Sequence, residues 1–94
     1  MFRVPFDYEV APERQAEFED VYGPGGGWAR FFRAGAGYAG TTLERVGDGR
    51  YRVTDHWESR EQYERFLADN ADRYAELSRA GERLYVSERR LPPT

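Results

Sequence analysis

Apolar and polar residues alternate at the beginning of the chain, from Phe2 to Val10. A period of two residues is typical of a β-strand that buries one of its faces. Pro5 lies within this segment and has no backbone N–H to donate, so we expect the strand to lie at the edge of a sheet or to leave that position unpaired. The predicted buried face carries the apolar residues of the alternation, Phe2, Val4, Phe6, Tyr8 and Val10.

The next segment changes to the three- and four-residue spacing of an amphipathic helix, over residues 12–22. Pro12 suits the first turn of this helix, because a backbone N–H has no helical partner there. The glycine-rich run Gly23–Gly27 ends the helix. Residues 28–33 then hold three large aromatic side chains and predict a short helical turn.

Two further strands are predicted over residues 38–46 and 50–57. The connection between them is Gly47-Asp48-Gly49, and an Asp-Gly pair between two such segments is a strong signal for a tight turn. The two strands therefore form a β-hairpin.

A second helical region follows the hairpin. Ser59 and Gln62 stand three residues apart at its beginning, which is the spacing of a capping box. The apolar stripe continues past Asn70, which we expect to interrupt and recap the helix. The stripe consists of Tyr63, Phe66, Leu67, Tyr74, Leu77 and Leu84. A last strand is expected over residues 84–91, where Pro92–Pro93 ends it.

The order strand, helix, hairpin, helix, strand is the split βαβ arrangement of a ferredoxin-like domain. We therefore expect an α+β fold in which a four-stranded antiparallel sheet carries its helices on one face, with residues 1–94 forming a single domain. A chain of 94 residues buries only about two-thirds of its unfolded surface, so a partner subunit would add useful burial.

Side-chain alternation divides the strand over residues 50–57 into two faces. Asp55 and Trp57 share the face that carries Tyr51 and Val53, and this largely apolar set should lie under the helices. His56 points the other way, with Arg52 and Thr54. We expect His56 and Arg52 to share a polar face with Asp7 of the first strand, and this face either meets water or lines an interface between two sheets.

Asp55 is the exception on the helix-covered face, because a buried carboxylate must find hydrogen-bond donors or shift its pKa. It either caps a helix or pairs with an arginine, or it acts as an acid or base in a pocket beside Trp57 and Tyr63. His56 has either a structural role or, with a pKa near neutrality, a catalytic one. Trp57 and Trp28 are either core residues or part of the pocket.

Composition and charge exclude several classes of protein. The chain has 14 basic residues, all of them arginine, against 17 acidic ones, and its net charge of −3 gives no footprint for nucleic acid. There is no apolar run of membrane-spanning length and no signal-peptide pattern, so we expect a cytoplasmic protein that contacts no membrane. The absence of cysteine and lysine excludes thiolate and Schiff-base catalysis, cysteine–zinc sites and a P-loop.

The run Gly23–Gly27 could suggest a phosphate-binding loop, but it follows a helix rather than a strand and lacks the GK[ST] ending. It serves either as a flexible connection or as the hinge of an aromatic flap formed by Trp28, Phe31 and Phe32.

Three pieces of the chain, YGPGGGWARFFRAGAGYAGTTL, RYRVTDHWESREQYERF and YAEL, resemble in order and spacing the antibiotic biosynthesis monooxygenase-type domain of the dimeric α/β-barrel superfamily. The resemblance covers most of the chain. It implies a homodimer in which two ferredoxin-like subunits bring their sheets together. The polar face with His56, Asp7 and Arg52 would then line the interface or a polar lumen.

The resemblance also implies chemistry, because similar proteins include oxygenases that use no metal or organic cofactor and act on phenolic or quinol-type polyketides. Trp57 matches the family's strand-end tryptophan, and Tyr63 matches an aromatic hydroxyl on the following helix. With Asp55 as the proton acceptor, these are the candidate catalytic residues. The candidate substrate-binding residues are Trp28, Phe32, Tyr8, Phe66 and Tyr74.

Two positions depart from the family pattern. Related oxygenases use an asparagine from the sheet, where this chain has Val53. The haem-degrading branch uses a histidine from the later helix, where this chain offers Tyr74 and Glu76, so haem degradation is disfavoured. Two hypotheses therefore remain: a cofactor-independent monooxygenase, and a non-catalytic homodimer that binds a small aromatic ligand or assists another enzyme.

Overall fold

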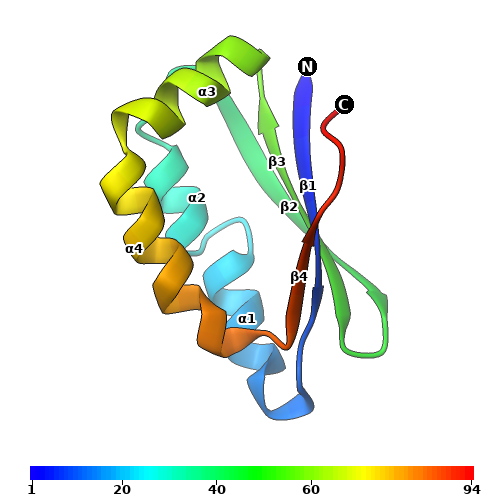
Figure 1. The fold of residues 1–94 in the computed structure, drawn as a ribbon. Coiled ribbons are helices and arrows are strands. Elements are labelled where there is room, and N and C mark those ends of the chain that lie inside the picture. The colour runs from blue at the N-terminus through cyan, green and yellow to red at the C-terminus, as the bar shows by residue number, and fades with distance from the viewer.

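A four-stranded antiparallel sheet carries all of the helices on one face (Figure 1). The computed structural model describes residues 1–94. The strands are β1 (Phe2–Glu9), β2 (Tyr38–Gly47), β3 (Arg50–Trp57) and β4 (Ser87–Arg90), in the order β2-β3-β1-β4. The helices are α1 (Gln15–Tyr22), α2 (Gly27–Phe32), α3 (Arg60–Asp69) and α4 (Ala71–Gly81), with 3₁₀ turns at Pro12–Arg14 and Glu82–Leu84. The predicted α+β, ferredoxin-like fold is confirmed, and none of these helices has the length and apolarity to span a bilayer.

β1 is a central strand, so the expectation of an edge strand was wrong. It pairs with β3 on one side and with β4 on the other. The second expectation, that Pro5 is left unpaired, holds on the β4 side alone, because β4 ends at Arg90, opposite Phe6, whereas Pro5 pairs with Thr54 of β3 on the other side. Pro5 lies just beyond that end, where its carbonyl accepts a hydrogen bond from the Leu91 N–H at 3.0 Å. A proline fits inside this sheet because the ladder stops beside it.

The last strand begins later than expected, at Ser87 rather than near Leu84. Leu84 lies in the 3₁₀ turn that follows α4, and its side chain is buried in the core. The apolar spacing that suggested a strand start therefore belongs to the end of the helical layer.

The helix-covered face of β3 follows the predicted alternation. Four residues at every second position are buried, namely Tyr51, Val53, Asp55 and Trp57. Arg52, Thr54 and His56 lie between them on the open face. The core above this face forms two aromatic clusters, and Phe6 and Trp28 pack against both.

The helical region after the hairpin begins and breaks where expected. Ser59 caps α3, since its Oγ accepts from the Gln62 N–H at 3.2 Å. Asn70 separates α3 from α4, but it does not recap the chain as expected. Its Nδ2 donates to the Phe66 carbonyl at 2.9 Å, so its side chain satisfies the end of α3 and leaves the start of α4 without a side-chain cap.

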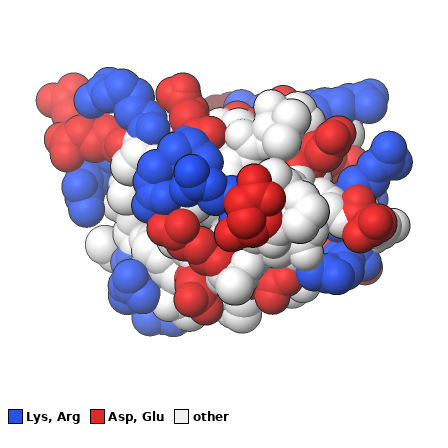
Figure 2. Space-filling view, turned by 90° about the horizontal axis from the view of Figure 1, so that it is seen from below, with Lys and Arg blue, Asp and Glu red and all other residues white.

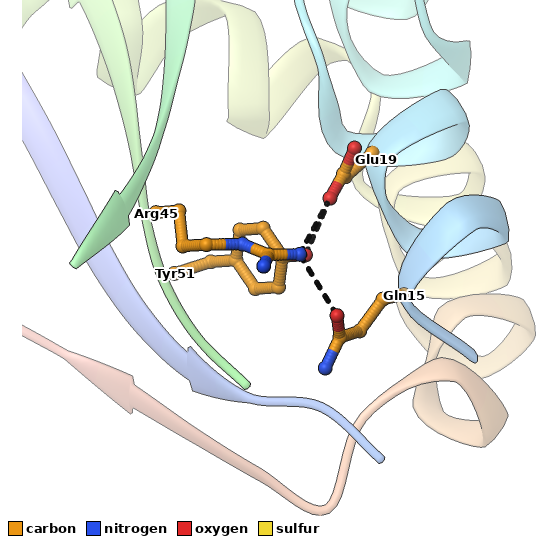
Figure 3. Close-up of polar contacts among 4 residues, drawn as sticks. All are labelled: Gln15, Glu19, Arg45 and Tyr51. Carbon is orange, nitrogen blue, oxygen red and sulfur yellow. Dashed lines mark hydrogen bonds and ion pairs between the residues drawn. The ribbon is translucent and has the colours of Figure 1, made fainter. Parts of the chain in front are cut away.

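The end of the hairpin is tied to α1 by a polar cluster of four side chains (Figure 3). Arg45 donates through Nη2 to Gln15 Oε1 and to the Tyr51 hydroxyl, both at 2.8 Å. The Tyr51 hydroxyl in turn donates to Glu19 Oε2. Because Tyr51 is buried, this cluster fixes the position of α1 over the sheet through hydrogen bonds that are partly shielded from water.

Acidic and basic side chains are interspersed over the end of the molecule seen in Figure 2. Some oppositely charged side chains of the protein form ion pairs, such as Arg83 and Glu17, whose Nη2 and Oε2 atoms lie 2.8 Å apart. This face therefore presents no extended patch of one sign.

Candidate functional site

A cavity lies between the sheet and the helices. Its volume is about 60 Å³, which is room for a few water molecules but not for a fused-ring ligand. Most of its lining is aromatic: Phe6, Tyr8, Tyr22, Trp28, Phe32, Val53, Asp55, Tyr63, Tyr74, Ser78, Tyr85 and Glu88. A larger ligand would therefore need the surrounding side chains to move.

Six of the eight candidate catalytic and substrate-binding residues line this cavity, namely Asp55, Tyr63, Trp28, Phe32, Tyr8 and Tyr74. Trp57 and Phe66 do not. Both are buried in the adjacent core cluster, where their rings lie 5.5 Å apart between centroids. The structure thus brings together most of the residues that the sequence suggested. Trp57, in contrast, belongs to the core behind the cavity wall.

Trp57 is fully buried and has an unusual polar feature. Its indole Nε1 is shielded from solvent and has no hydrogen-bond acceptor. Its ring packs at 5.6 Å from that of Tyr63 and at 5.7 Å from that of Phe32, and both of these residues line the cavity. A buried donor without a partner costs stability, so this N–H is an unused donor next to the cavity wall.

Asp55 is the buried acid of the cavity. Its only hydrogen bond comes from Thr41, whose Oγ1 donates to Oδ1 at 2.8 Å. It pairs with no arginine and caps no helix, so that interpretation was wrong and the pocket interpretation remains a prediction. Burial raises the pKa of Asp55 to about 6, and the bond from Thr41 opposes this rise. The group is therefore mostly ionised at neutral pH and can take up a proton.

The tyrosines around Asp55 remain protonated at neutral pH. Burial raises the pKa of Tyr63 to about 12, against a smaller effect of the Arg90 charge. Arg90 donates through Nη2 to the Tyr63 hydroxyl, at a distance of 3.4 Å. Tyr63 is therefore held as a hydrogen-bond donor, with a cation close to its oxygen.

Sequence reasoning missed several lining residues, of which Glu88 is the most informative. Glu88 lies opposite Tyr8 in the β1–β4 register, and the Tyr8 hydroxyl donates to its Oε2 at 2.6 Å. Burial and this carboxylate raise the pKa of Tyr8. The segment SERR reads as a polar edge strand, and nothing in it fixes the register that brings Glu88 to the cavity. The other missed residues are Phe6, Tyr22, Val53, Ser78 and Tyr85.

His56, Asp7 and Arg52 lie on the open face of the sheet and not at the cavity. Arg52 donates to Asp7 through Nε at 2.7 Å and through Nη2 at 3.0 Å, which lowers the pKa of Asp7. His56 Nε2 lies 3.3 Å from Thr42 Oγ1, and burial together with the charge of Arg3 lowers its pKa. A histidine here cannot reach a ligand on the other side of the sheet.

No protein-family model and no curated protein sequence matches the chain. A candidate antibiotic biosynthesis monooxygenase from Deinococcus radiodurans superposes with a TM-score of 0.75 at 14% identity, over 100% of this chain and 90% of that one. SnoaB, a cofactor-independent oxygenase from Streptomyces nogalater solved in a mutant form, gives 0.71 at 23% identity, over 99% of this chain and 89% of that one.

A third structure is that of the monooxygenase ActVA-Orf6 of Streptomyces coelicolor in complex with nanaomycin D. It superposes with a TM-score of 0.73 at 24% identity, over 99% of this chain and 80% of that one. Similarity at this level of identity concerns the fold, and it extends over essentially the whole chain. The protein therefore has the ferredoxin-like α+β fold of the antibiotic biosynthesis monooxygenase-type domains.

Proposed function

We propose that the protein is a cofactor-independent oxygenase that oxidises a phenolic or quinol-type aromatic compound in the cavity between sheet and helices. The observation that carries this proposal is a buried carboxyl, Asp55, with a pKa of about 6 in an aromatic cavity that also holds a tyrosine donor. An aromatic lining suits a planar ring. A base of this strength can take a proton from an acidic phenol or a ring CH₂ next to a carbonyl.

The chemistry requires the substrate itself to reduce dioxygen. Asp55 takes the proton, and the resulting anion gives one electron to O₂. The radical pair then joins in a C–O bond, and the resulting peroxide anion takes up a proton from water to give a hydroperoxide. Loss of water leaves a carbonyl, so that a ring CH₂ becomes C=O while the second oxygen atom leaves as water. The Tyr63 hydroxyl, which accepts a hydrogen bond from Arg90, would donate to the oxygen on which charge develops.

Two of the similar structures support this proposal. One is that of a cofactor-independent oxygenase, and another is that of a monooxygenase in complex with nanaomycin D. The same fold over almost the whole chain makes an equivalent use of this cavity reasonable, while the residues that carry the chemistry must be tested in this protein itself.

The open face of the sheet supports a homodimer as part of the proposal. Four charged residues of alternating sign form one row across the strands, in the register order Glu44, Arg52, Asp7 and Arg89. A two-fold axis that lies between two such faces and runs along the strands would reverse the row, so that Glu44 opposes Arg89 and Arg52 opposes Asp7 of the second copy. Light scattering after size exclusion should give about twice the 10.9 kDa chain mass. A mass of one chain at micromolar concentration would contradict the dimer.

A second candidate function is ligand binding without catalysis, and one observation favours it. Val53 lines the cavity, and the family resemblance implies that related oxygenases use an asparagine from this part of the sheet. An apolar side chain there supplies surface for a ring but no donor for a developing oxyanion. The same cavity would then hold an aromatic compound for another enzyme.

Oxygen consumption with a panel of hydroquinones and anthrones tests the oxygenase. We expect Asp55→Asn and Tyr63→Phe each to lower kcat by about 10²-fold or more, in the range of lost acid–base or oxyanion contacts. His56→Gln, on the open face, is the matched control and should keep its activity. If no compound is oxidised faster than in buffer while the same compounds quench tryptophan fluorescence on binding, the binding function replaces the oxygenase.

A further inference from the structure

A bulge in β2 brings two hydroxyl side chains to the helix-covered face of the sheet. The register of β2 against β3 shifts between Tyr38 and Gly40, and Gly40 adopts a φ of +116°. Residues three apart in a regular strand point to opposite faces. The extra residue of the bulge lets Tyr38 and Thr41 point to the same one. Their side chains meet through a short hydrogen bond between the two hydroxyl oxygens.

The two hydroxyls and Asp55 form a directed chain. Thr41 lies opposite Asp55 in the register, and its Oγ1 donates to Asp55 Oδ1 at 2.8 Å. A threonine hydroxyl has one proton, so with that proton committed to the carboxylate the bond between Tyr38 and Thr41 must be donated by Tyr38. The order of donation is Tyr38 to Thr41 to Asp55, and the chain ends at the acid of the cavity.

The chain runs from the cavity wall toward the surface. Asp55 and Thr41 are each 6% exposed, whereas Tyr38 is only partly buried. Neither Tyr38 nor Thr41 lines the cavity. A proton on Asp55 therefore has a hydrogen-bonded path to the surface that passes through the cavity wall and does not cross the space that a ligand would occupy.

We propose that Thr41 and Tyr38 relay protons between Asp55 and solvent, so that Asp55 can discharge a proton taken from a ligand without returning it to the cavity. For this step the two hydroxyls turn away from the resting order of donation, so that Asp55 donates its proton to Thr41 Oγ1, Thr41 passes its own to the Tyr38 oxygen, and Tyr38 releases its own to water. One proton leaves, each hydroxyl keeps one, and Asp55 is again a carboxylate. The source of the proton rests on the proposed oxygenase, whereas the path rests on the two hydrogen bonds alone.

No other group around Asp55 offers an equivalent path. β1 places Val4 opposite it, and α2 contributes the Phe32 ring to the same cavity. None of the titratable groups that line the cavity with it is hydrogen-bonded to it, namely Tyr8 of β1, Tyr22 of α1, Tyr63 of α3, Tyr74 of α4, Glu88 of β4 and Tyr85.

At the outer end of the path, burial raises the pKa of Tyr38. The charge of Asp55 also raises it, while the bond with Thr41 and the charge of exposed Arg33 oppose the rise. Because Tyr38 is the one partly exposed member of the hydrogen-bonded chain, its hydroxyl is the point of exchange with water.

The relay can be tested without any substrate by following the Asp55 side-chain carboxyl by ¹³C NMR through its titration. Tyr38→Phe keeps the bond from Thr41, so the pKa of Asp55 should change little, while proton exchange at the midpoint slows by about tenfold, the effect of one lost transfer contact. Thr41→Val should slow exchange similarly and also raise the pKa, because a donor to the carboxylate is lost. Thr41→Ser should restore both the rate of proton exchange and the pKa of Asp55.

Thr42→Val is the matched control, because Thr42 is the neighbouring threonine on the open face and contacts His56 instead. It should leave the titration of Asp55 unchanged. Exchange at Asp55 that is as fast in Tyr38→Phe as in the wild type would overturn the relay, even if Thr41→Val did not fold. An intact relay in a protein that oxidises nothing would count against the oxygenase alone.

Discussion

Trp57 and His56 are adjacent in the chain and lie on opposite faces of the sheet. The Trp57 indole is fully buried beneath the helices, among the rings of Phe32, Tyr38 and Tyr63. The His56 imidazole lies on the open face beside Thr42. Substitutions at the two positions should therefore have separate consequences.

We expect Trp57→Ala to lower the free energy of unfolding by about 3–5 kcal/mol, as large-to-small changes of core aromatics do. Trp57→Phe should cost less than about 2 kcal/mol, because it also removes a buried N–H that has no acceptor. Urea unfolding measures both. His56→Gln is the control and should stay within about 0.5 kcal/mol of the wild type. A Phe variant as unstable as the Ala variant would show that the unpaired N–H carries no cost.

Asp55→Asn should change how stability depends on pH. Burial raises the folded pKa from 3.8 to about 6, so the folded state binds the proton more tightly than the unfolded state. The wild type is therefore most favoured below pH 4 and loses stability relative to the Asn variant as the pH rises to about 6. This difference between the folded and unfolded pKa values corresponds to a loss of about 3 kcal/mol in the free energy of unfolding.

The measurement is urea unfolding of both proteins between pH 4 and 8. Asp20→Asn is the control, because it removes a carboxylate from the exposed side of α1. A difference between wild type and Asp55→Asn that does not vary with pH would contradict the assignment of a raised pKa to Asp55.

Gly35→Ala should destabilise the protein by roughly 1–3 kcal/mol through overpacking. A Cβ at this position would lie 2.7 Å from Phe66 Cδ1 and 2.8 Å from Trp57 Cη2, and both atoms belong to packed core rings. Gly25→Ala is the matched control, because a Cβ there meets no atom within 4 Å. It should be neutral or stabilising by about 0.4–1 kcal/mol. Equal thermal shifts for the two variants would contradict close packing at Gly35.

Tyr51→Phe should lower the free energy of unfolding by about 1–2 kcal/mol, because it removes the hydroxyl that Arg45 and Glu19 share in Figure 3. Glu19→Gln and the double variant complete a thermodynamic cycle. We expect a coupling of about 0.5 kcal/mol or more between Tyr51 and Glu19. Strictly additive effects would mean that the two side chains do not stabilise one another.

Alternation was enough to predict much of this molecule. The two faces of β3 follow from a period of two residues, and with them the burial of Trp57 and Asp55 and the position of His56. The hairpin followed from its Asp-Gly turn, where Gly49 adopts a φ of +67°. These features depend on local spacing, which a single sequence contains.

The features that were missed depend on register. Alternation would separate Tyr38 from Thr41, and only the bulge at Gly40 brings them together. Glu88 reaches the cavity because it lies opposite Tyr8 in the β1–β4 register. The uniformly polar sequence of β4 does not specify this register between two segments far apart in the chain. Pro5 suggested an edge because a proline breaks a ladder, and the end of β4 beside it was not visible in the sequence.

β4 has four residues, and the side chain of every one of them is exposed, whereas the eight-residue strands β1 and β3 pair along their whole length. Amide deuterium uptake should therefore begin in β4 long before it reaches the β1–β3 ladder. This weakest flank of the sheet holds Glu88 at the rim of the cavity. Brief fraying there would move Glu88 away from the cavity while the central strands stay paired, so the lining contributed by β4 is the part that gives way first.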